Sequence, residues 1–98
     1  MEKIEDVIEI LNKVKCAKTP EWKGHYILQK EYNTPLDGPF KAYKSSRYTL
    51  WNIVENTKTP VITVQQVFNT AEISKEDIIK IMDEQLLVHL FAIIHTLL

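Results

Sequence analysis

Cysteine and glycine are scarce in this chain of 98 residues, which contains one cysteine and two glycines. A single cysteine, Cys16, cannot form an internal disulfide, and this fits a reducing compartment, so we expect a cytoplasmic protein. The two glycines, Gly24 and Gly38, do not form the clustered loop that cradles a nucleotide phosphate. Disulfide-rich folds and phosphate-loop chemistry are therefore excluded.

Long hydrophobic runs are also lacking. The longest one, residues 86–98, is well short of the ~20 residues that a membrane span needs, and Lys80, Asp83 and Glu84 precede it. The N-terminal residues are acidic, without the basic-then-apolar order of a secretory signal. We expect no membrane association, and we expect the N-terminal segment to be structural.

Residues with catalytic or metal-binding chemistry are few and badly spaced. His89 and His95 are six residues apart, which on a helix directs them ~120° from each other, whereas metal ligands on one helix lie three or four residues apart. No spacing places Cys16 or a serine beside a base. We predict no metal, no cofactor and no enzymatic activity.

What the chain does contain is typical of a globular protein, with 45% apolar and 26% charged residues. Its length suits one hydrophobic core and leaves no room for two. We therefore expect residues 1–98 to form a single compact domain.

Helices are predicted at both ends of the chain. Over residues 3–18, apolar side chains recur at helical spacing, with acids at the start and lysines at the end, as the helix dipole favours. Near the other end, Ser74 and Asp77 form a variant capping box, and Ile73 and Ile78 occupy the positions of a hydrophobic staple. These signals predict a long C-terminal helix that begins near Lys75.

Strands are predicted between the helices. Over residues 25–32, aromatic and aliphatic side chains partly alternate with polar ones, and turn-forming residues follow at 33–39. Phe40 to Lys44 is a candidate second strand, and residues 46–58 favour a strand by composition, although a serine there could cap a short helix. The fold class is therefore α+β: an N-terminal helix, a small antiparallel sheet of three or four strands, and the C-terminal helix packed on the sheet.

Residues 62–82 resemble the helix-turn-helix of bacterial repressors. Thr63 with Gln66 and Ser74 with Asp77 make two capping boxes at the spacing of two successive helices. The resemblance implies that this pair reads DNA. It departs from the pattern because Phe68 replaces a small residue, Glu72 replaces the turn glycine, and three acids between 76 and 83 would repel phosphate. A strand over 61–68, rich in β-branched residues, is the alternative.

The middle of the chain is basic and aromatic. Residues 13–58 carry a net charge of +5 and seven of the nine aromatic residues, whereas the two ends are acidic. We predict a non-catalytic protein-binding regulatory, adaptor or inhibitor domain that uses this region, residues 23–51. The alternative is a nucleic-acid-binding regulator that uses the same basic region or residues 63–82. The candidate partner-binding residues are Lys23, Lys30, Lys41, Tyr43, Lys44, Arg47 and Trp51.

The C-terminal helix carries a second apolar stripe over its last three turns. It lies beside the main stripe and widens the apolar arc of the helix. This arc favours either an internal core position or a homodimer contact. The candidate dimer residues are Leu87, Phe91, Ile94 and Leu98.

Overall fold

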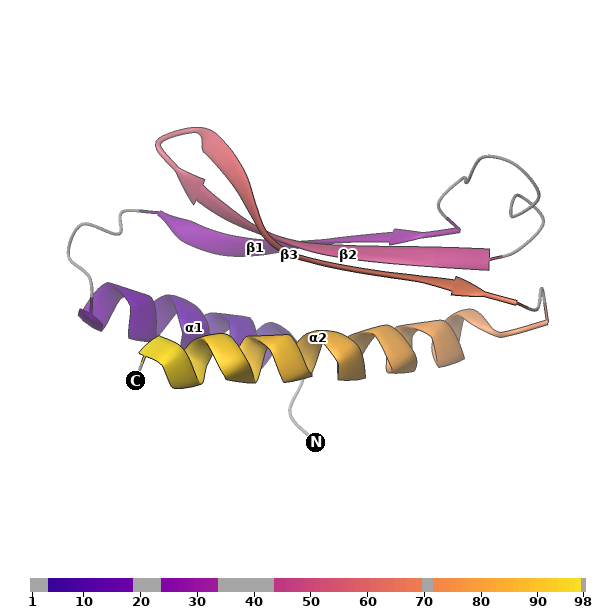
Figure 1. Ribbon diagram of the computed structural model, residues 1–98. Helices are drawn as coiled ribbons and strands as arrows, with labels where there is room; N and C mark the ends of the chain where they lie inside the picture. Colours follow the sequence, from indigo (N-terminus) through magenta and orange to yellow (C-terminus); the bar gives the residue numbers. More distant parts are fainter. Residues whose placement is uncertain (1–3, 19–23, 34–43, 70–71, 98) are drawn as a thin grey trace.

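The computed structural model describes residues 4–18, 24–33, 44–69 and 72–97 (Figure 1). In chain order its elements are α1 (Ile4–Lys18), β1 (His25–Tyr32), β2 (Lys44–Val54), β3 (Thr57–Phe68) and α2 (Lys75–Leu97). The strands form one layer, and both helices lie side by side in a second layer against one face of the sheet. The predicted α+β arrangement is confirmed, with three strands.

The sheet is an antiparallel meander in the order β1-β2-β3. Glu55 and Asn56 connect β2 to β3 with φ values of 48° and 72°. Positive φ at both central residues is the geometry of a type I′ turn, whose twist matches that of the flanking strands. The strand prediction for residues 46–58 is confirmed around this turn. Of the candidate strand at residues 40–44, Lys44 begins β2 and the rest lies outside the described residues.

Residues 62–68 are a strand, which corrects the helix-turn-helix expectation for residues 62–82. Thr57–Phe68 pairs along β2, with Val64 opposite Tyr48 and Ile62 opposite Leu50. β-branched side chains favour this pleated position over a helix. The second half of the segment forms the expected helix: Lys75 begins α2, and the backbone N–H of Asp77 donates to Ser74 Oγ at 3.1 Å.

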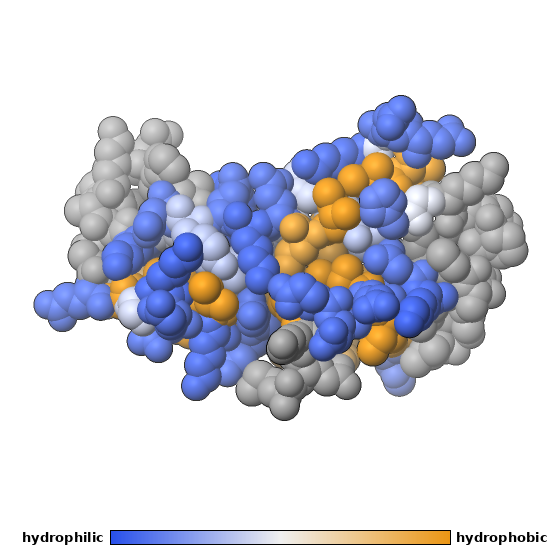
Figure 2. Space-filling model, turned by 180° about the vertical axis from the view of Figure 1, so that it is seen from behind, coloured by the Kyte–Doolittle hydropathy of each residue, from blue (hydrophilic) through white to orange (hydrophobic). Residues whose placement is uncertain are grey.

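The hydrophobic core lies between the sheet and the helices and contains residues from all five elements. Figure 2, the view from behind Figure 1, shows hydrophobic side chains between the sheet and the helix layer. Even-numbered residues of β1 and β2 face this core because side chains alternate along a strand. The buried apolar residues are Ile4, Val7, Leu11, Tyr26, Tyr48, Leu50, Val64, Phe68, Ile78, Met82, Leu86, Leu87 and Leu90.

Candidate binding surface

Strand alternation divides the predicted partner-binding residues between the two faces of the sheet. Lys30 and Lys44 have the same parity as the core residue Tyr48, so both point toward the helices. Lys44 Nζ donates to the backbone oxygen of Ile73, 2.7 Å away, just before α2. The other predicted residues that the structure describes, Arg47 and Trp51, lie on the opposite face. Lys23, Lys41 and Tyr43 lie outside the described residues.

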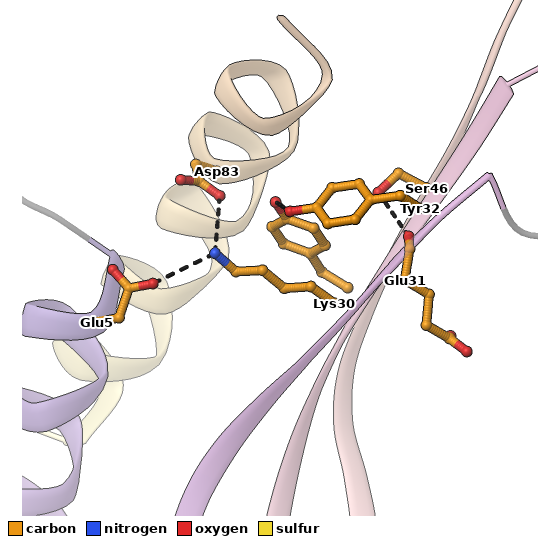
Figure 3. Close-up of polar contacts among 7 residues, drawn as sticks. Glu5, Lys30, Glu31, Tyr32, Ser46 and Asp83 are labelled. Carbon is orange, nitrogen blue, oxygen red and sulfur yellow. Dashed lines mark hydrogen bonds and ion pairs between the residues drawn. The ribbon is translucent and has the colours of Figure 1, made fainter. Parts of the chain in front are cut away.

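Lys30 lies between the two helices (Figure 3). Its Nζ is 3.4 Å from Glu5 Oε1 of α1 and 3.8 Å from Asp83 Oδ1 of α2. The same ammonium is 5.2 Å from the ring centroid of Tyr48. The acids come from the two acidic ends of the chain, so the charge of this lysine is balanced inside the molecule. Lys30 therefore links the sheet to both helices.

Two tyrosines complete this polar cluster. The hydroxyls of Tyr32 and Tyr48 are 2.9 Å apart, and their rings meet edge to face. Burial raises the pKa of Tyr48 well above its usual range, and the hydrogen bond to Tyr32 and the charge of Asp83 act in the same direction. Burial also raises the pKa of Tyr26. Tyr26, Tyr32 and Tyr48, three aromatic residues of the basic middle, therefore belong to the helix-facing side of the sheet.

Neither of the two described helices packs on the opposite face of the sheet, which we call the open face (Figure 1). The strand register places Ile27, Trp51 and Pro60 side by side across the three strands. Ile27 is 36% exposed and Pro60 is exposed, so this apolar row faces outward. Two polar rows follow, Gln29-Thr49-Thr63 and Glu31-Arg47-Gln65. The two polar rows, with Trp51 and Pro60 of the apolar row, line a shallow hollow of about 510 Å³.

Side chains on the open face hold one another in place. Trp51 Nε1 donates to Gln29 Oε1 at 2.9 Å, and Lys58 Nζ lies 4.3 Å from the ring centroid of Trp51. Arg47 is similarly fixed, because its Nε donates to the Gln65 side chain at 3.3 Å and its Nη1 lies 3.8 Å from Glu31 Oε2. An indole and a guanidinium are thus both oriented by neighbouring strands. Such preorganisation lowers the entropy lost when a partner binds.

Comparison with known proteins gives no family assignment: no protein-family model, no curated protein and no solved structure matches the chain.

The candidate dimer stripe of α2 does not form one exposed surface. Leu87 is buried in the core and Ile94 packs partly against it, whereas Phe91 is 50% exposed. The side chain of Leu98 lies outside the described residues. Within the described part of the chain, neither helix is long and apolar enough to span a membrane, and no three potential metal ligands lie together.

Proposed function

We propose that this protein is a non-catalytic interaction domain that binds another protein through the open face. The observation that carries the proposal is the apolar row of Ile27, Trp51 and Pro60, which lies outward on the face that neither described helix covers. In a sheet with one solvated face, the strand residues that point to the solvent are ordinarily polar. Here the strand alternation instead brings a tryptophan and two further apolar residues to the surface.

The chemistry of the open face resembles a protein-binding surface more closely than a phosphate-binding one. Trp and Arg are the residues that most often dominate protein interfaces, and an apolar centre with a polar border is their usual arrangement. Trp51 and Arg47 supply these two groups, and Gln29, Thr63 and Gln65 supply polar neighbours. The acid Glu31 lies beside Arg47, which lowers the attraction for phosphate.

The experiment compares immobilised wild-type protein with Trp51→Ala and Arg47→Ser variants, using a nuclease-treated extract and identifying the retained proteins. We expect one protein to be retained by the wild type and lost with Trp51→Ala, because truncating an interface anchor costs about 2 kcal/mol or more. Lys80→Ala, on the exposed side of α2, is the matched control and should behave as the wild type. Equal retention by wild type and Trp51→Ala would contradict the proposal.

A single-stranded nucleic acid is the second candidate ligand, because the Lys58 ammonium lies over the Trp51 ring and Arg47 lies four residues before Trp51 on the same face of β2. Its binding would weaken steeply between about 50 and 200 mM salt. Protein binding through the apolar row would change little over this range. Titration of a labelled oligonucleotide at both salt concentrations distinguishes the two ligands.

A further inference from the structure

β1 is an edge strand of the sheet that the described residues form. Its outward side is identified by Tyr26, whose backbone N–H points away from β2 and donates to Asn12 Oδ1 of α1 at 2.8 Å. The Asn12 amide nitrogen donates in return to the Tyr26 carbonyl at 3.4 Å. Peptide groups alternate in direction along a strand, so those of Leu28 and Lys30 also point away from β2.

A groove runs beside this outward edge. Its volume is about 290 Å³, and it is lined by Glu5 and Ile8 of α1 and by Ile27, Leu28 and Lys30 of β1. Figure 2 shows hydrophobic side chains gathered between the sheet and the helix layer on this side of the molecule. The Asn12 contact with Tyr26 closes one end of the edge, so the groove accompanies the part of β1 that begins at Leu28.

We propose that this edge binds an extended segment of another protein, which adds to the sheet as a fourth strand beside Leu28 and Lys30. Backbone N–H and C=O groups at an edge pair with an extended chain, and neighbouring pockets select its alternate side chains. The groove requires an aliphatic side chain against Ile8 and Leu28. The groove shares Ile27 with the open face, but its other lining residues and the outward backbone groups of Leu28 and Lys30 lie elsewhere, so the proposal does not depend on the function proposed for that face.

The acidic residues at the groove favour a basic residue on the incoming segment. Two acids, Glu5 and Asp83, lie beside Lys30 at this end of the groove. The Glu5 side chain is 69% exposed at the groove. A lysine or arginine on the incoming segment therefore finds a complementary carboxylate there.

A second copy of this chain is a poorer occupant than a foreign segment. A two-fold axis at Lys30 would place this lysine opposite its own counterpart, and like charges directly opposite destabilise a strand pair. An axis at Leu28 or Gln29 would bring Tyr26 into the pairing. The peptide groups of Tyr26 are already bonded to Asn12. An axis at Glu31 would place two glutamates opposite each other, which is also a like-charge pair, so each of these registers is disfavoured.

The test uses a fluorescein-labelled nonapeptide of alternating valine and threonine with one central lysine, measured by fluorescence anisotropy. Two further peptides of the same sequence are N-methylated at odd or at even positions. Only one set of amides faces the edge in strand addition, so one methylated peptide should bind at least about tenfold more weakly while the other should bind within about twofold of the parent. Equal weakening of both, or no binding of the parent up to about 1 mM, would overturn the proposal.

Protein variants test the same edge from the other side. Both Lys30→Pro and Lys30→Ala remove the ion pairs of Lys30. Only Lys30→Pro also removes the outward backbone N–H, a change that an edge strand tolerates. We expect at least about tenfold weaker peptide binding for Lys30→Pro than for Lys30→Ala. Circular dichroism establishes that both are folded.

Ile8→Lys provides a second comparison that does not alter the strand. It places a charge in the groove, whereas Ile10→Lys changes an exposed position of α1 outside the groove lining. Ile8→Lys should lose the peptide and Ile10→Lys should retain it. Equal affinity of these two variants, or a wild-type dimer that Lys30→Pro converts to monomer, would overturn the proposal of a foreign segment at this edge.

Discussion

The two faces of the sheet place similar residues in opposite roles. On the face toward the helices, Lys30 is paired with acids from both helices and its neighbours are buried. On the open face, Arg47 pairs with Glu31 of the adjacent strand at a partly exposed position. Both residues come from the same basic stretch of sequence. The position within the pleat, more than the charge of the region, therefore decides which cation lies among the helices and which lies on the open face.

The largest effect is expected for Leu50→Ala, which tests the inner face. Leu50 is fully buried beneath the helices, and truncating such a side chain leaves a cavity. The free energy of unfolding should fall by about 2–5 kcal/mol. Urea denaturation measures this loss. Thr63→Ala, on the open face, is the control, and an equal loss there would contradict the distinction between the two faces.

High pH should also act on the inner face. The pKa of Tyr48 is raised in the folded state, so the unfolded chain ionises first. The contribution of this tyrosine to stability is therefore complete below pH ~10 and is lost above it, at about 1.4 kcal/mol per pH unit. Thermal unfolding at pH values from about 8 to about 11 measures this pH dependence of stability. The range brackets the ordinary tyrosine pKa of about 10.

Tyr48→Phe is the matched control for the pH experiment, because it removes the ionising group and keeps the ring. Above the ordinary tyrosine pKa, the free energy of unfolding should then fall less steeply with pH. Tyr26, whose pKa is also raised, accounts for the pH dependence that is left. An unchanged slope would show that Tyr48 ionises equally in the folded and unfolded chains.

Trp51→Ala tests the open face and should separate stability from binding. Trp51 is partly exposed, so its truncation should lower the free energy of unfolding by about 1 kcal/mol or less. Partner binding should weaken by at least about tenfold. Denaturation and capture experiments on the same variant measure both quantities. A large loss of stability with unchanged capture would assign Trp51 to the core.

The smallest effect on stability is expected for Arg47→Ala. The ion pair with Glu31 joins two side chains that are 37% and 40% exposed, and water screens it. The free energy of unfolding should change by less than about 0.5 kcal/mol. A loss comparable to that of Leu50→Ala in the same denaturation assay would mean that the open face is structural.

The elements of the fold could be predicted from local patterns. Helical spacing and the capping residue Ser74 gave both helices and the start of α2, and the β-branched composition of residues 61–68 outweighed the capping spacing of Thr63 and Gln66. That spacing misled because a capping pattern does not require a helix when the segment can pair with a neighbouring strand. Tertiary pairing with β2 decided the outcome.

The site was less predictable because charge counting ignores the direction of side chains. The two-residue period of β1 already groups Lys30 with Tyr26 and Leu28, and this parity would have assigned Lys30 to the inner face. The apolar row could not be found in this way. It depends on the register among three strands and on the irregularity at Leu50/Trp51, which brings Pro60 opposite Trp51.

The first and last of the five described elements lie together, because α1 packs beside α2. During synthesis the strands can pair as soon as they leave the ribosome, whereas α1 must wait for α2 before the core closes. In the interval the inner faces of the sheet and of α1 present their apolar residues to chaperones or to neighbouring nascent chains. Nascent chains arrested before Lys75 should therefore bind a hydrophobic-surface dye, and chains extended past Leu97 should not.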